Sequence, residues 1–130
     1  MTSILLIEDH HLFADSLVRM LNGRGYKEVS VAYSAEDALR LLPDLSVDLA
    51  LVDVALPKMN GIDLVEVLRS EYPELVCLVI SGHMSTRYAR RSLEAGARGY
   101  AVKDSAAGII QGIQTVMRGE IYLSEDLGSL

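Results

Sequence analysis

The feature that most constrains this 130-residue chain is a regular alternation of short, continuous apolar runs with longer segments of helical period. Continuous rather than alternating hydrophobicity is typical of parallel strands that are covered on both faces. The runs lie at residues 4–7, 29–32, 49–52, 75–80 and 99–102. We therefore expect five parallel strands.

Helical patterns fill the intervals between these runs. The patterns lie around residues 12–21, 35–42, 62–69, 86–95 and 109–117. Leu12 and Leu17 belong to the apolar face of the first, whereas Ser34 and Asn60 are suitable N-caps for the second and third. Glycines or prolines follow each pattern at its end. Strands that alternate with helices predict an α/β fold, a doubly wound five-stranded parallel sheet flanked by five helices.

Composition narrows the class of protein. Half of the residues are hydrophobic, which supplies a full core, and no apolar run approaches the roughly 20 residues of a membrane span. The first residues carry no basic stretch typical of a signal peptide, and the single Cys77 suits a reducing compartment. A net charge of −6 argues against direct binding of nucleic acid. We expect a cytoplasmic protein without membrane contact, with one domain at 1–124 and the start of a linker or tail at 125–130.

Polar residues stand at the ends of four of the five runs. They are Glu8 and Asp9 after the first run, Asp53 after the third, Ser81 after the fourth and Lys103 after the fifth. Ligands of open parallel sheets bind outside the carboxyl ends of the strands. We therefore expect three carboxylates, one hydroxyl and one ammonium to converge at one edge of the sheet.

Such a cluster of carboxylates needs positive charge. At about 4 Å each pair repels by on the order of 1–4 kcal/mol, and Lys103 offsets only one of the three charges. Carboxylates, water and phosphate oxygens are the ligands that Mg²⁺ prefers. The residues therefore predict a Mg²⁺-dependent phosphoryl-transfer site with a carboxylate nucleophile. Taken singly, Asp9 or Asp53 could instead cap the helix that follows it.

The order of these residues resembles the receiver domains of bacterial two-component response regulators, which have a flavodoxin-like or CheY-like fold. The resemblance covers residues 4 to about 124. It rests on Ile7-Glu8-Asp9-His10, on Asp53-x-x-x-Pro57-x-x-x-Gly61, on Ser81-Gly82 and on Gly99-Tyr100-Ala101-Val102-Lys103-Asp104. The segments His10-His11-Leu12-Phe13 and Arg118-Gly119-Glu120 are similar to those of LuxR and NarL-type regulators, which carry a C-terminal helix-turn-helix domain.

The resemblance implies a role for each acidic residue. Asp53 would be the phosphoacceptor and would take a phosphoryl group from a phosphohistidine of a sensor histidine kinase. Glu8, Asp9, Asp53 and the main-chain carbonyl of Ala55 would hold Mg²⁺, for which Mn²⁺ could substitute. Glu8 stands where Asp is commoner in the family, so its longer side chain puts the geometry of the metal shell in question.

The resemblance also implies a switch. Ser81 and Lys103 would bind phosphoryl oxygens, and Tyr100 would be the switch aromatic that turns inward as Ser81 moves. Independently of the resemblance, the position of His83 two residues beyond Ser81 predicts that it modulates dephosphorylation by influencing how water reaches an aspartyl phosphate. Asp104 stands where many receivers have proline, which leaves the geometry of the Lys103–Asp104 bond open.

These roles describe an autocatalytic phosphoacceptor with intrinsic turnover of its aspartyl phosphate rather than a classical enzyme. The implied partners are the kinase and a second copy of the chain, through homodimerisation on phosphorylation. DNA would be bound only through an output domain that we expect to be absent from this sequence, in a regulator of transcription.

Two other functions compete with this interpretation. The first is a receiver-like interaction module that acts without phosphorylation, although such a module has no need of both Asp53 and Lys103. The second is an enzyme that transfers phosphoryl groups of small molecules, but Ala55 occupies the position where it would need a second carboxylate. The basic residues Arg87, Arg90 and Arg91 form either a solvated face or a partner-contact patch, and the adjacent His10 and His11 make a poor chelate.

Overall fold

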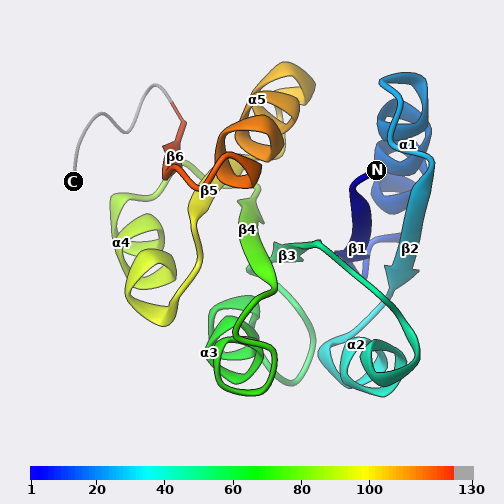
Figure 1. Ribbon diagram of the computed structural model, residues 1–130. Helices are drawn as coiled ribbons and strands as arrows, with labels where there is room; N and C mark the ends of the chain where they lie inside the picture. The colour runs from blue at the N-terminus through cyan, green and yellow to red at the C-terminus, as the bar shows by residue number, and fades with distance from the viewer. Residues whose placement is uncertain (125–130) are drawn as a thin grey trace.

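The computed structural model describes residues 1–124, so the predicted linker or tail at 125–130 lies outside the described residues. Strands and helices alternate along the chain as the sequence predicts (Figure 1). Their bounds are β1 Ser3–Ile7, α1 His11–Gly23, β2 Glu28–Ala32, α2 Ala35–Leu41, the 3₁₀ turn η1 Leu42–Asp44, β3 Leu49–Asp53, α3 Gly61–Glu71, β4 Val76–Ser81, α4 Thr86–Ala95, β5 Gly99–Val102, α5 Ala106–Met117 and β6 Tyr122–Leu123. The predicted doubly wound parallel α/β fold is confirmed.

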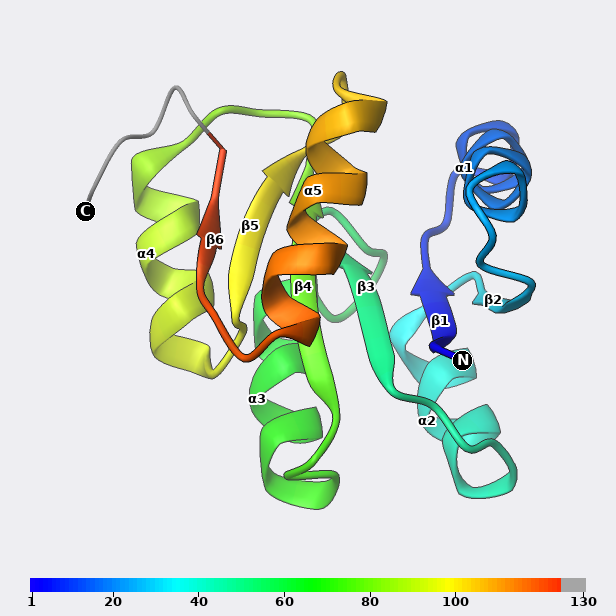
Figure 2. The ribbon, with the colours of Figure 1, turned by 45° about the horizontal axis from the view of Figure 1, so that its top comes forward.

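The strands form one parallel sheet in the order β2-β1-β3-β4-β5-β6. One core lies between the sheet and α1 with α5, and the other lies between the sheet and α2, α3 and α4. Figures 1 and 2 show these helices on opposite sides of the strands. Since β1, β3, β4 and β5 are covered on both faces, their sequences are continuously apolar.

The predicted count of five strands is wrong by one, because the described residues contain a sixth. Residues Tyr122 and Leu123 pair in parallel with Gly99 and Tyr100 of β5. Beyond them, the Ser124 hydroxyl accepts a hydrogen bond of 3.2 Å from the amide of Val102. A two-residue strand has no apolar periodicity, so no sequence pattern indicates it.

Local signals set the helix ends as predicted. Ser34 Oγ accepts from the amide of Asp37 at 3.1 Å, and Asn60 Oδ1 accepts from that of Asp63 at 2.9 Å. Gly96 ends α4 with φ of 118°, a conformation that favours glycine. The prediction that Leu12 contributes to the core face of α1 is wrong, because its side chain is 75% exposed.

The loop after β3 is held tightly against the end of that strand. The amide of Val54 donates to the Ile80 carbonyl at 3.1 Å, and that of Gly61 donates to the Val54 carbonyl at 2.8 Å. A Cβ at Gly61 would lie 2.0 Å from the carbonyl oxygen of Asp53. Only glycine therefore allows α3 to begin so close to β3.

No helix within residues 1–124 has both the length and the apolar character needed to cross a membrane.

Replacing Gly61 with alanine should lower the free energy of unfolding by about 3 kcal/mol, because the new methyl group overlaps backbone that cannot move freely. Gly23→Ala is the matched control, since nothing lies within 4 Å of its added Cβ. We expect that control to be neutral or stabilising by about 0.5 kcal/mol. Equal urea midpoints for Gly61→Ala and the unsubstituted protein would contradict the close approach.

Candidate functional site

The carboxyl ends of four neighbouring strands bring the predicted polar residues together. Glu8 and Asp9 follow β1, Asp53 is the last residue of β3, Ser81 is the last residue of β4, and Lys103 follows β5. The parallel register fixes this placement, since Asp53 stands beside Ile80, and Ser81 stands beside Val102. Convergence at one edge of the sheet follows directly from the topology.

Lys103 is the ionic centre of this cluster. Its Nζ lies 2.6 Å from Glu8 Oε1 and 3.1 Å from Asp53 Oδ2. Both carboxylates are buried, with residue exposures of 0% for Glu8 and 2% for Asp53. Buried charges without a partner are strongly destabilising. The single ammonium therefore makes it possible for two carboxylates to remain in the interior.

Burial and charge move the pKa values of this pair. Burial raises the pKa of Glu8 above its usual value, with nearby Asp53 adding to the rise and contacts with Lys103 and the His10 amide opposing it. Burial alone would lower the pKa of Lys103, but its contacts with Glu8 and Asp53 outweigh burial and raise it. Lys103 therefore remains charged at neutral pH, and its stabilising contribution is lost only as the pH rises past the usual lysine range.

The acidic cluster has the chemistry of a site for a hard divalent cation. Ligand oxygens of Glu8, Asp9 and Asp53 all lie within 4.8 Å of one another. Glu8 Oε1 is buried without a well-directed hydrogen bond among the described residues, and its 2.6 Å contact with Lys103 is an ion pair. Three carboxylates beside one ammonium leave two negative charges, which fits Mg²⁺ or a similar ion.

The alternative that these aspartates only cap helices is wrong. The N-cap of α1 is His10, whose side chain makes no capping hydrogen bond, and the N-cap of α3 is Asn60. Asp53 instead accepts a 3.2 Å hydrogen bond at Oδ1 from the amide of Ala55, within its own loop.

The β4–α4 loop connects Ser81 to Tyr100. The Ser81 hydroxyl accepts a 3.1 Å hydrogen bond from the amide of His83. The carbonyl of His83 in turn accepts a 2.7 Å hydrogen bond from the Tyr100 hydroxyl. Tyr100 is fully buried, and burial raises its pKa. The predicted switch residues therefore share one hydrogen-bonded chain, with Tyr100 in the inward position.

Sequence reasoning assigned no site role to Phe13. The Lys103 Nζ lies 4.8 Å from the centroid of the Phe13 ring, within range of a cation–π contact. The ring covers the ammonium from α1, roughly 90 residues away in the chain. Nothing in the local pattern around Phe13 distinguishes it from a core residue.

The structure also answers two questions from the sequence: whether the histidines bind a metal, and whether the Lys103–Asp104 peptide bond is cis. His11 stacks on the ring of Tyr33 at 3.9 Å between centroids, and no histidine belongs to a metal-binding group in the described part of the chain. Among residues 1–124 no peptide bond is cis, so the Lys103–Asp104 bond is trans.

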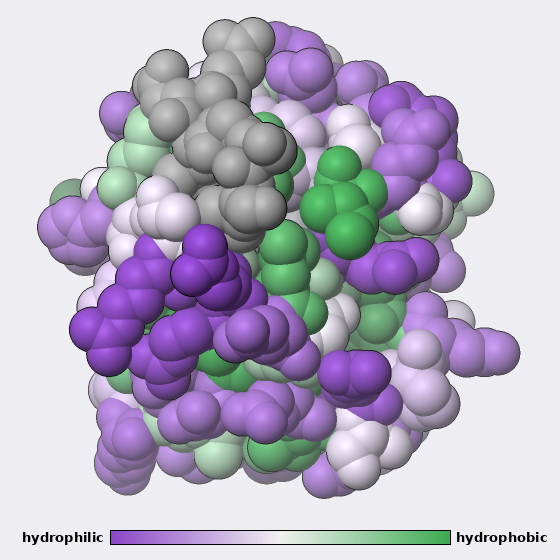
Figure 3. Space-filling model, turned by 90° about the vertical axis from the view of Figure 1, so that its left-hand side faces the viewer, coloured by the Kyte–Doolittle hydropathy of each residue, from purple (hydrophilic) through white to green (hydrophobic). Residues whose placement is uncertain are grey.

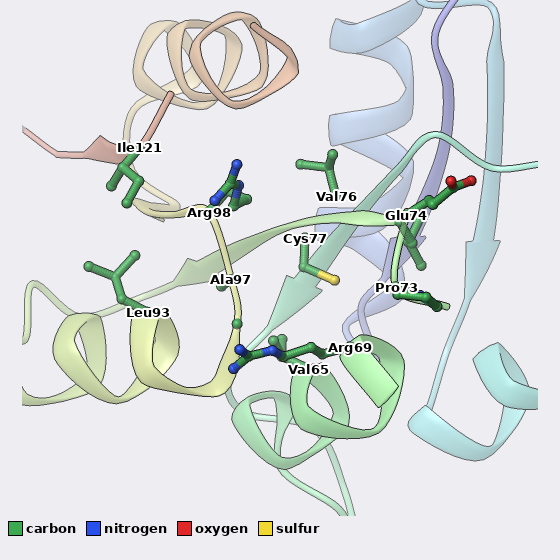
Figure 4. Close-up of a pocket in the computed structure, with 12 residues that line it drawn as sticks. Val65, Arg69, Pro73, Glu74, Val76, Cys77, Leu93, Ala97, Arg98 and Ile121 are labelled. Atoms are coloured by element: carbon green, nitrogen blue, oxygen red, sulfur yellow. The ribbon is translucent and has the colours of Figure 1, made fainter. Parts of the chain in front are cut away.

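A hollow of about 460 Å³ opens beside the cluster and is lined by Asp53, Ser81 and Lys103. Another hollow, of about 430 Å³, lies near the amino ends of β4 and β5. Figure 4 shows its lining side chains, most of which come from α3, β4, α4 and the segment leading into β5. Its one thiol is Cys77, whose pKa burial raises to about 12, so it stays protonated and unreactive. Of these two hollows, only the first is lined by the predicted site residues Asp53, Ser81 and Lys103.

The model of one protein family, the response regulator receiver domain, matches residues 4–114. The chain belongs to this family. Its receiver domain has the acidic cluster at the position expected from the topology of the sheet. Membership supports signalling by phosphorylation in a two-component system, and the predicted resemblance to receiver domains is confirmed.

Curated relatives of this receiver domain include regulators of transcription. The chain is 31% identical over 122 residues to the transcriptional regulatory protein DegU of Brevibacillus brevis, with 92% of this chain and 52% of DegU covered. It is 35% identical to the transcriptional regulatory protein MctR of Rhizobium johnstonii, covering 93% of this chain and 58% of MctR. The chain thus spans little more than half the length of these relatives.

Solved structures show the same fold. A two-component response regulator of the LuxR family from Aurantimonas sp. SI85-9A1 has a TM-score of 0.91 at 30% identity, over 98% of this chain and 93% of that one. A LuxR family DNA-binding response regulator from Silicibacter pomeroyi has a TM-score of 0.83 at 33% identity, over 97% and 99%. The predicted similarity to LuxR and NarL-type regulators is therefore confirmed.

Replacing Lys103 with methionine should lower the free energy of unfolding by about 3 kcal/mol at neutral pH, because two buried carboxylates lose their counterion. The loss should shrink as the pH falls, since burial already raises the pKa of Glu8 and a protonated carboxyl needs no partner. Urea unfolding at a series of pH values measures both effects.

Lys58→Met is the control for this substitution, because Lys58 is exposed and has no ion pair within residues 1–124. A pH-independent loss in Lys103→Met, or an equal loss in both variants, would contradict the role of Lys103 as counterion.

Proposed function

We propose that this receiver domain is a phosphorylation-dependent switch whose phosphoacceptor is Asp53. The observation that carries the proposal is the position of the Asp53 carboxylate, 3.1 Å from Lys103 Nζ and within 4.8 Å of the ligand oxygens of Glu8 and Asp9. A nucleophile, a cation for the transferred group and a metal-binding cluster lie at one edge of the sheet. Membership of the receiver family supports the same role.

The chain's own residues suit each part of the transfer. An Asp53 oxygen forms the bond to phosphorus as the bond between phosphorus and the donor's histidine nitrogen breaks and its electron pair stays with the imidazole. The ammonium of Lys103 pairs with the incoming phosphoryl oxygens. The amide of Ala55, 3.2 Å from Asp53 Oδ1, keeps the carboxylate oriented. Mg²⁺ held by Glu8, Asp9, Asp53 and the Ala55 carbonyl would neutralise negative charge on the phosphoryl group.

Ser81 and Tyr100 form the response element of this proposal. A phosphoryl oxygen would offer the Ser81 hydroxyl a charged acceptor in addition to its 3.1 Å contact with the His83 amide. A shift of this loop carries His83 with it, and the Tyr100 hydroxyl bound to the His83 carbonyl would follow. His83 thus connects the phosphoryl site to β5, and its exposed side chain is placed to influence how water reaches an aspartyl phosphate.

Partners follow from the chemistry of the switch. A sensor histidine kinase would supply the phosphoryl group, and phosphorylation would favour a homodimer. Relatives named as transcriptional regulators extend well beyond the length of this chain, which supports an output through a DNA-binding domain in a cytoplasmic regulator. The domain would be a self-phosphorylating acceptor rather than a classical enzyme.

Asp53→Asn should abolish phosphorylation. Incubated with Mg²⁺ and acetyl phosphate, the unsubstituted protein should gain the mass of one phosphoryl group, and the variant should gain none because an amide oxygen is a poor nucleophile. Asp48→Asn, which alters an aspartate outside the site, is the matched control and should still be phosphorylated. Intact mass spectrometry measures the outcome. Full phosphorylation of Asp53→Asn would contradict Asp53 as the phosphoacceptor, whereas a lack of phosphorylation in the unsubstituted protein would favour an interaction module that acts without phosphorylation.

Asp9→Asn should weaken Mg²⁺ binding at least tenfold, since one of three carboxylate ligands is lost. Asp9 is exposed and has no ion pair in the described part of the chain, so its substitution should leave the fold intact. Isothermal titration with Mg²⁺ gives the affinity, with Asp15→Asn as a control on the adjacent helix α1. Unchanged affinity in Asp9→Asn would contradict the assigned ligand.

A further inference from the structure

The hollow beside Asp53 extends past the position of a phosphoryl group to helix α4. The buried Asp53 and Ser81 and the half-buried Lys103 line it together with two residues of α4, the half-buried Tyr88 and the exposed Arg91. A volume of about 460 Å³ is larger than the four heavy atoms of a phosphoryl group require. The hollow therefore has room for the part of a phosphodonor that departs.

Arg91 is the cation that α4 contributes to this hollow. In the described residues it has no ion pair, although Glu66 of α3 and Glu94 of α4 line a separate hollow of about 170 Å³ with it. Arg87 and Arg90 lie on the same helix but do not line the phosphoryl-site hollow. Figure 3 faces the edge of the molecule that carries α4 and β6, where the surface is largely hydrophilic.

We propose that Arg91 determines specificity for small phosphodonors by binding the negatively charged group that leaves as Asp53 is phosphorylated. This inference rests on the function proposed for Asp53 and adds the residue that distinguishes acyl phosphates from other small donors. A guanidinium stays charged at any physiological pH and pairs with a carboxylate through two parallel hydrogen bonds. Arg91 thus complements Lys103, which serves the phosphoryl group itself.

The transfer from acetyl phosphate requires no proton. An oxygen of the Asp53 carboxylate forms a bond to phosphorus, the bond between phosphorus and the acyl oxygen breaks, and its electron pair leaves with acetate. Negative charge therefore grows on the departing oxygen, where Arg91 stabilises it. From phosphoramidate protonated on nitrogen, the bond between phosphorus and nitrogen breaks and neutral ammonia leaves. That donor offers Arg91 no departing anion.

The test compares the two donors on the full chain with Mg²⁺ present. In Arg91→Ala the rate constant for phosphorylation by acetyl phosphate should fall about fivefold, and that for phosphoramidate should change by less than about twofold. Arg91→Lys should recover most of the loss, and the fall should diminish as salt screens the charge. Arg90→Ala is the matched control and should leave the ratio between donors unchanged.

Binding of beryllofluoride separates this role from damage to the phosphoryl site, because the complex has no leaving group. Arg91→Ala should bind it as tightly as the unsubstituted protein. An equal fall with both donors, or no fall with acetyl phosphate, would overturn the role of Arg91 while leaving Asp53 as phosphoacceptor. A lack of phosphorylation by either donor in the unsubstituted protein would contradict the proposed function itself, and with it the role of Arg91.

Discussion

The buried ion pairs of Lys103 with Glu8 and Asp53 are the interaction on which the rest of the site depends. Two carboxylates that are almost completely shielded from water share one ammonium at 2.6 and 3.1 Å. Without that ammonium, mutual repulsion and loss of hydration would disfavour the arrangement. Because the charge balance remains negative, the same cluster has the carboxylate oxygens and the net charge that a divalent cation would need. Stability and chemistry are therefore coupled through Lys103.

Backbone packing places these charges, and hydrogen bonds connect them to the β4–α4 loop. The close approach of Gly61 to the Asp53 carbonyl holds the end of β3 in position. On the other side, Ser81, His83 and Tyr100 form a hydrogen-bonded chain across the β4–α4 loop. A phosphoryl group on Asp53 would attract both Lys103 and Ser81, and through the loop contacts it would act on Tyr100, which belongs to the core.

The charge of the whole protein opposes the donors that the site is proposed to use. With a net charge of −6, the chain repels anions at long range. The hollow itself is lined by two cations, Lys103 and the exposed Arg91, so its local potential is more positive than the net charge of the chain suggests. Because Arg91 is exposed, its contribution is modest, and it affects the choice between donors more than the ability to be phosphorylated.

The sequence by itself determined the order of strands and helices, the caps at Ser34, Asn60 and Gly96, and the convergence of five polar residues at one edge. These features follow from short-range hydrogen bonding, hydrophobic period and the rules of parallel sheets. Only the tertiary structure decided that Leu12 faces water, that Tyr122 and Leu123 extend the sheet, and that Phe13 covers Lys103. The physical reason is that each of these depends on packing between segments distant in the chain, which no local pattern encodes. The same holds for the partner of Glu8, because only folding places its carboxylate against an ammonium 95 residues away.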